Sequence, residues 1–145
     1  MLWLRLISVL CAALFAGAAL YVSVVEHPAR MTLQTRMAAM QWAPSYKRGT
    51  WMQAPLAAIG LVSGGILAAL GAGTAWLLGA LLIGSAIPFT LVAIMPVNHR
   101  LLEPTRDLDS LDTRALLTKW GRFHAVRTAS GLLALLVNLW ALRTS

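Results

Sequence analysis

Residues 60–84 read GLVSGGILAALGAGTAWLLGALLIG, which is two apolar runs joined by the short connection GAGT at 71–74. Each run continues outward until it reaches about 20 residues, the length that a helix needs to cross the hydrocarbon core of a membrane. A connection this short, with two glycines, permits only a tight antiparallel turn. The stretch therefore predicts a hairpin of two transmembrane helices.

Two further apolar runs predict a bundle of four helices. Of the 145 residues, 59% are hydrophobic and 12% are charged, and the mean hydropathy is +0.72. This composition is too apolar for a soluble domain, and the chain is too short for two domains. We expect an all-α integral membrane four-helix bundle, a single domain over residues 1–145, with spans at 2–25, 51–70, 75–97 and 124–142.

The first apolar run has a second interpretation as a cleaved signal peptide, because Arg5 precedes it and Ala16-Gly17-Ala18 resembles a cleavage site. The run continues through LYVSVV without a polar region before cleavage. That continuation favours a helix that is retained.

The basic residues predict the orientation in the membrane. Ten of the 12 lysines and arginines lie in or beside the two long connections, and the other two are Arg5 and Arg143. Basic loops remain in the cytoplasm. We therefore expect both termini outside and the long loops inside, in the inner membrane of a bacterium. The net charge of +7 follows from this topology and predicts no nucleic-acid partner, since acidic residues interrupt the second basic loop.

The two long connections are expected to be partly helical. Pro28 suits a first helical turn, and Leu33, Met37 and Met40 then share one face. This pattern predicts a short interfacial helix after the first span. In the second connection, Asp109 or Ser110 can cap a helix that begins in the cytoplasm and continues into the fourth span.

Three local patterns describe the ends and the packing of the spans. Trp42 and Trp51 would anchor the interfacial helix at the headgroups, and Thr50 with Gln53 has the spacing of a capping box at the start of the second span. Pro88 should kink the third span. Small residues at every fourth position of the second span predict a close approach of another helix; they are Gly60, Gly64, Ala68 and Ala72.

Polar side chains gather near the predicted cytoplasmic ends of three spans. On the fourth helix, Trp120, His124 and Arg127 are spaced by four and three residues and so share one face. Ionisable groups at this depth are costly unless they pair or line a cavity. The candidates that end the first and third spans are Glu26, His27, Asn98 and His99.

Two other interpretations of these residues stay open. In a purely structural one, Glu26 pairs with Arg30 or Arg127, the histidines cap helix ends, and Trp120 is an interfacial anchor. In the other, three histidines and a glutamate bind iron, copper, zinc or haem. The second pattern is weak, because each histidine comes from a different helix end and the sequence contains no HxxxH.

The chain also resembles a known family. The resemblance rests on VEHPAR at 25–30, QW at 41–42, PFTLVAIMPVNHRLL at 88–102 and KWGRFHAVRT at 119–128. This set is similar to the anthrone-oxygenase-like family of small four-helix membrane proteins, most of unknown function. The resemblance implies oxidation of an apolar aromatic or quinol-like substrate by molecular oxygen without a cofactor.

Such chemistry needs a base, a group that holds an oxyanion, and an apolar pocket. His124 is the base candidate, with Glu26 as the partner that sets its tautomer. Arg127, Asn98 and Trp120 are candidates to bind the oxyanion and the ring, and His27 and His99 are further substrate-binding candidates. The competing hypothesis is an accessory or scaffold subunit of a membrane complex. Besides the lipid bilayer and the substrate, a second copy of the chain is a candidate partner.

Overall fold

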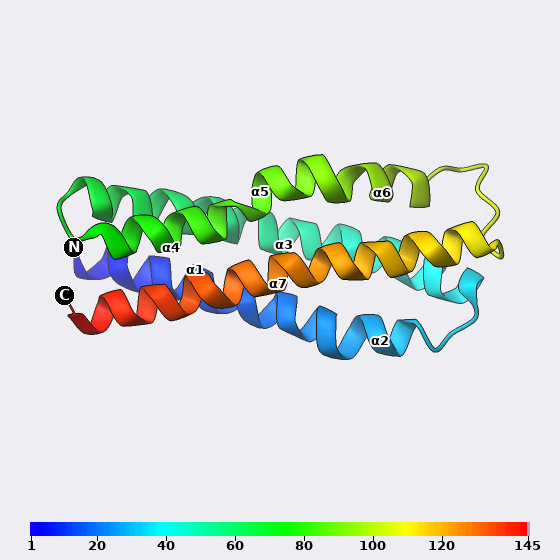
Figure 1. The fold of residues 1–145 in the computed structure, drawn as a ribbon, viewed down its shortest axis with the longest axis horizontal. Helices are drawn as coiled ribbons and strands as arrows, with labels where there is room; N and C mark the ends of the chain where they lie inside the picture. The colour runs from blue at the N-terminus through cyan, green and yellow to red at the C-terminus, as the bar shows by residue number, and fades with distance from the viewer. Residues whose placement is uncertain (145) are drawn as a thin grey trace.

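The structure is a computed structural model that describes residues 1–144, and it consists of four long helical rods (Figure 1). Each rod is long and apolar enough to cross a membrane. The all-α four-helix bundle is thus confirmed, and it is consistent with an integral membrane protein. In chain order the elements are α1 (Leu2–Tyr21), η1 (Val22–Glu26), α2 (His27–Arg30), α3 (Thr35–Ala69), α4 (Thr74–Gly84), α5 (Ala86–Phe89), η2 (Thr90–Ile94), α6 (Met95–Leu101) and α7 (Leu111–Thr144), where η denotes a π-helical turn.

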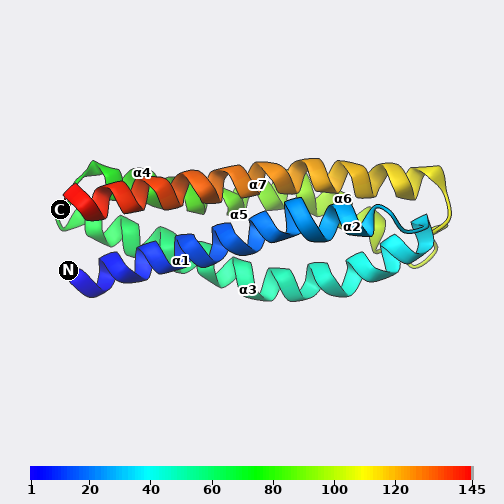
Figure 2. The ribbon, with the colours of Figure 1, turned by 90° about the horizontal axis from the view of Figure 1, so that it is seen from below.

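The four rods lie side by side along their length (Figures 1 and 2). Helix α1 packs against α3 and α7, and α4 packs against the same two helices. Both chain ends lie at one end of the bundle, together with the turn between α3 and α4. We call this the terminal end. The loops at 31–34 and 102–110 lie at the opposite end, which we call the basic end.

The α3–α4 hairpin forms as its sequence predicts. Gly71 and Gly73 have positive φ angles of 77° and 116°, which glycine adopts readily and other residues do not. Above the turn the two helices touch at Gly64, where a Cβ atom would lie 2.8 Å from the Cβ of Ala80 and 2.9 Å from the carbonyl oxygen of Trp76. The close approach predicted from the small residues is therefore confirmed at this position.

The predicted separate interfacial helix is wrong: Pro28 lies in α2 and Leu33 in the loop at 31–34, whereas Met37 and Met40 belong to the first turns of α3. This helix runs unbroken for 35 residues, with Pro44 and Pro55 inside it. At 1.5 Å per residue it is about 50 Å long and exceeds the hydrocarbon core of about 30 Å. An unbroken helix keeps its backbone groups hydrogen-bonded, whereas a break at the interface would leave several without partners. The predicted extension of the fourth helix is confirmed, since α7 begins at Leu111.

Two predictions that depended on the interfacial helix also change. Thr50 does not begin a helix; its hydroxyl donates to the carbonyl oxygen of Tyr46 at 3.0 Å within α3. Trp42 is not an interfacial anchor but is 1% exposed and stacks on Tyr46 with ring centroids 5.1 Å apart. Trp51, by contrast, is 84% exposed, as an anchor would be.

The third rod is interrupted near its middle. Helix α4 ends at Gly84 and α5 begins at Ala86, two residues before Pro88, and Figure 1 shows the axis stepping sideways there. Proline has no N–H to complete the preceding turn, so the predicted kink is confirmed. The two π-turns also lie next to prolines. The turn η1 ends two residues before Pro28, and η2 ends two residues before Pro96. Such turns often occur near functional sites.

Candidate functional site

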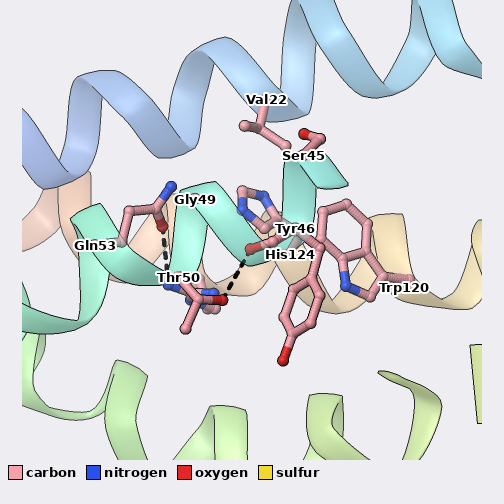
Figure 3. Close-up of a pocket in the computed structure, with 9 residues that line it drawn as sticks. Val22, Ser45, Tyr46, Gly49, Thr50, Gln53, Trp120 and His124 are labelled. Atoms are coloured by element: carbon pink, nitrogen blue, oxygen red, sulfur yellow. Dashed lines mark hydrogen bonds between the residues drawn. The ribbon is translucent and has the colours of Figure 1, made fainter. Parts of the chain in front are cut away.

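A small cavity, partly open to the outside, lies between η1, α3 and α7. Its volume is about 30 Å³, enough for about one or two water molecules. We call it the histidine cavity. Figure 3 shows side chains of α3 and α7 turned toward it, with Val22 above. Its lining residues are Val22, Ser45, Tyr46, Gly49, Thr50, Gln53, Trp120, His124 and Arg127.

The α7 residues predicted to share one face do meet in this cavity. The ring of His124 stacks on that of Trp120 with centroids 4.9 Å apart and planes 25° apart. His124 is 3% exposed and Trp120 is 5% exposed. Arg127 lies one turn further along the same face and also lines the cavity. The predicted helical spacing thus places an imidazole and a guanidinium around one buried space.

A chain of hydroxyl groups fixes which nitrogen of His124 carries the proton. The Ser23 hydroxyl lies 3.1 Å from Nδ1 of His124 and 2.8 Å from the hydroxyl of Thr128. The Thr128 hydroxyl also lies 3.1 Å from the carbonyl oxygen of Ala19 and 3.2 Å from that of His124. Carbonyl oxygens only accept, so Thr128 donates its proton to one of them.

The remaining protons follow from that assignment. With the Thr128 proton on a carbonyl oxygen, Ser23 donates to Thr128, and the Ser23 oxygen accepts from Nδ1–H of His124; this is the arrangement in which all of these contacts are hydrogen bonds. Nε2 then keeps its lone pair, and the one side-chain hydrogen bond of the His124 ring within residues 1–144 is made by Nδ1. A neutral imidazole held in this form can accept a proton from a molecule in the cavity.

Arg127 is a cation without a carboxylate partner among the described residues. Its Nη2 donates to Oε1 of Gln53 at 2.8 Å, its Nε has no partner in residues 1–144, and its guanidinium lies 5.5 Å above the ring of Phe15. A charge inside a membrane bundle is costly unless it is paired or serves a ligand. This guanidinium is therefore available for an anionic oxygen.

An apolar pocket adjoins the histidine cavity at Arg127. It lies between α3, α5, η2 and α7 and has a volume of about 160 Å³. We call it the lateral pocket, because Leu91 in its wall is 59% exposed on the outer face of the bundle. Its polar residues are Thr50, Gln53, Thr90 and Arg127, and the others are apolar: Ala54, Ala57, Ala86, Ile87, Leu91 and Met95.

Glu26 does not contact His124, contrary to its predicted role in setting the tautomer. Its Oε1 accepts from Arg30, with which it forms an ion pair, from Ser45 and, at 3.4 Å, from Gln41. Arg30 lies four residues further along the same helix and is buried. The ion pair with Arg30 is the one that the structural interpretation of Glu26 predicts. Ser23, which sequence reasoning missed, takes the position beside His124 instead.

His27 also packs against Trp120. Its ring centroid is 5.5 Å from that of Trp120, and a Cβ atom on Gly121 would overlap its Nε2. His27 therefore packs onto the aromatic cluster through the gap that Gly121 leaves, outside the residues that line the histidine cavity.

The candidates on α6 lie away from the cavity. Asn98 is 0% exposed, and its amide nitrogen and oxygen have no hydrogen-bond partner among the described residues. His99 is exposed at the basic end. In residues 1–144 no three side chains of histidine, cysteine, aspartate or glutamate come close enough to hold a metal ion. The three histidines thus do not form the shared ligand set that the metal interpretation requires.

Gln53 is the second residue of the site that sequence reasoning missed. It is 3% exposed and lines both the histidine cavity and the lateral pocket. Its position in the capping-box pattern masked this role. A signal was present, because an amide within an otherwise apolar membrane span must face a polar partner inside the bundle.

Together these features define a class of protein: an all-helical bundle, apolar enough to cross a membrane, with a buried histidine, a guanidinium that has no carboxylate partner among the described residues, and an apolar side pocket. The sequence model of the family described as anthrone oxygenase matches residues 42–137. That range includes Gln53, Trp120, His124 and Arg127. The chain belongs to the anthrone oxygenase family. No curated protein and no solved structure matches the chain.

Proposed function

We propose that the protein oxidises an apolar aromatic ketone of the anthrone type with molecular oxygen. The observation that carries this proposal is the guanidinium of Arg127, which has no carboxylate partner among the described residues, at the junction of an apolar pocket and a cavity lined by His124. The aromatic rings occupy the lateral pocket. Their ketone oxygen points toward Arg127.

The reaction starts with removal of a proton from the ring methylene group by Nε2 of His124. The negative charge moves to the ketone oxygen, where Arg127 stabilises it in a setting that excludes most water. The enolate carbon bonds to molecular oxygen, which takes up the electron pair, and the proton held on Nε2 of His124 passes to the outer oxygen to give a hydroperoxide at the former methylene carbon. Loss of one water molecule from this hydroperoxide leaves the second carbonyl of the quinone. One oxygen atom enters the product and the other leaves as water.

The lateral pocket supports an apolar substrate, because it opens on a face of the bundle that carries exposed leucine. Substrate and oxygen both partition into lipid and can enter from the side. Before the reaction, the hydroxyl chain from Ser23 to Thr128 holds His124 in the form in which Nε2 can accept a proton. No step in this scheme requires a cofactor. We therefore include cofactor independence in the proposal.

Oxygen consumption with an anthrone tests the assignment of the two central residues. General-base catalysis contributes a factor of about a hundred to ten thousand, so His124→Gln should lower turnover by that range. Arg127→Lys keeps the charge but loses the planar fork and should also lower turnover. The matched controls are His99→Gln and Arg122→Lys, which change exposed residues outside the cavity and should leave turnover unchanged.

Full activity of His124→Gln would refute the base assignment. If the wild-type protein in detergent or nanodiscs consumed no oxygen with any anthrone or quinol offered, the accessory-subunit hypothesis would replace the oxidase. Size-exclusion chromatography of each variant must give the wild-type profile, so that loss of activity is not loss of folding.

A further inference from the structure

A long groove runs along the outer face of the bundle between the first rod and α3. Two adjoining hollows form it, with volumes of about 420 and 500 Å³, and they share Ala18 and Met52. The first hollow is polar at its far end, where Glu26, Ser45 and Arg48 lie. The second is apolar, with Leu14, Trp51 and Leu56 among its lining residues. We call the whole feature the α1–α3 groove.

The length of the α1–α3 groove matches one leaflet of a membrane. Along the first rod it extends from Ala13 to Glu26, which is about 20 Å at 1.5 Å per residue. The hydrocarbon layer of a single leaflet is about 15 Å thick, half of the whole core. A single extended acyl chain can therefore lie along the groove, with its headgroup at the basic end.

Two glycines keep the groove open. A Cβ atom on Gly17 or on Gly49 would have no heavy atom within 4 Å. Gly17 lies in the apolar part of the groove and Gly49 near its polar end. Close helix packing does not explain either glycine, because neither one touches a neighbouring helix at that point. Their effect is to leave space on the outer surface.

The polar end of the groove has an uncompensated positive charge. Arg48 has no carboxylate partner among residues 1–144. Glu26 at the same end is already paired with the buried Arg30. The two arginines and one glutamate sum to a charge of +1. A guanidinium at the membrane interface attracts anionic headgroups and binds phosphate oxygens well.

We propose that the α1–α3 groove binds one anionic phospholipid from the leaflet at the basic end. Its phosphate contacts Arg48, and one acyl chain lies over Gly17. Val22, Gly49 and Gln53 line both this groove and the histidine cavity, so the bound lipid covers that side of the cavity. The lipid site goes beyond the proposed oxidation, and its test needs no activity measurement.

Native mass spectrometry in mild detergent, with added phosphatidylglycerol or phosphatidylcholine, measures the site directly. The wild-type protein should retain one phosphatidylglycerol in preference to phosphatidylcholine. Arg48→Gln removes one interfacial cation and should weaken retention about fivefold. Gly17→Leu fills the groove, displaces several methylene groups of the chain and should weaken retention by at least about tenfold.

The chain offers a matched control for each variant. Lys47→Gln removes the neighbouring exposed cation, which does not line the groove, and should retain the lipid. Gly65→Leu makes the same substitution at another glycine with open space around it, outside the groove, and should also retain it. Both variants at the groove should still elute as the wild-type species in size-exclusion chromatography.

Three results would overturn the proposal. Unchanged phosphatidylglycerol retention in Gly17→Leu would show that no chain lies in the groove. Equal losses in Lys47→Gln and Arg48→Gln would show attraction by general surface charge. Equal retention of phosphatidylcholine by the wild-type protein would show that the site does not select an anionic headgroup.

Discussion

At the scale of single residues, the two ionisable side chains of the site, His124 and Arg127, are hydrogen-bonded to uncharged neighbours. His124 receives its orientation from the hydroxyl of Ser23, and Arg127 from the amide of Gln53. Neutral partners leave the guanidinium positive and the imidazole free to accept a proton. A carboxylate in either place would neutralise the cation or stabilise the protonated ring. The arrangement therefore favours binding of an anion, as the proposed oxidation requires.

Removing the Ser23 hydroxyl should test this role. In Ser23→Ala the ring of His124 loses the group that accepts from Nδ1–H, so both tautomers become populated and the ring is less well oriented. We expect turnover with an anthrone to fall about tenfold, the value of one hydrogen bond of about 1.4 kcal/mol. Ser23→Thr keeps a hydroxyl and should restore part of the activity.

Ser63→Ala provides the control for that experiment. Ser63 is also a buried serine, but its hydroxyl bonds to the carbonyl oxygen of Gly60 within α3. The pH profile of turnover should change in Ser23→Ala and not in Ser63→Ala. An unchanged rate and pH profile in Ser23→Ala would show that the hydroxyl does not position the base.

Sequence reasoning succeeded for residues whose positions depend on one regular helix. The α-helical period places Trp120, His124 and Arg127 on one face wherever α7 begins and ends. Ser23 and Gln53 were missed for a different reason. Each is a single polar residue in a largely apolar stretch, and the partner that identifies it comes from another helix far along the chain.

At the scale of elements, irregular turns decide which candidates reach the site. A π-turn closes with one additional residue, which rotates every later side chain by about 100° relative to an unbroken helix. The turn η2 ends one residue before Met95, so the face that Asn98 occupies could not be obtained by counting from the third span. The predicted helix start at Thr50 is wrong for a different reason. A capping-box pattern and a nearby proline are typical of a helix start, but the backbone of α3 continues through them as one helix.

The contact between α3 and α4 gives a prediction at this scale. In Gly64→Ala the new methyl group would lie 2.8 Å from the Cβ of Ala80, so one helix must move. We expect this overpacking to cost about 1–3 kcal/mol and to lower the midpoint of thermal unfolding in detergent.

Gly65→Ala is the matched control on the adjacent residue. Its methyl group would meet nothing within 4 Å, so the substitution should keep or slightly raise stability through the better helix propensity of alanine, worth about 0.5–1 kcal/mol. The difference between the two midpoints measures the helix contact. Equal midpoints would mean that α3 and α4 are not in close contact at Gly64.

At the scale of the whole molecule, the distribution of charge along the bundle predicts its orientation. Ten of the 12 lysines and arginines lie toward the basic end, where Arg36 pairs with Asp109, and Arg100 and Arg106 pair with Asp112. The Arg36–Asp109 pair joins the start of α3 to the second long connection. From the positive-inside rule we expect this end to lie in the cytoplasm, with both termini and the α3–α4 turn on the opposite side.

Labelling of single cysteines with a membrane-impermeant maleimide should test that orientation. The background is Cys11→Ser, which removes the natural thiol of α1 so that each variant carries one cysteine. Thr74→Cys lies at the α3–α4 turn and Thr105→Cys lies in the 102–110 loop, and both positions are exposed. In intact spheroplasts we expect Thr74→Cys to be labelled and Thr105→Cys to be protected until the membrane is permeabilised. Labelling of Thr105→Cys alone would reverse the topology, and it would place the Arg48 end of the α1–α3 groove in the outer leaflet.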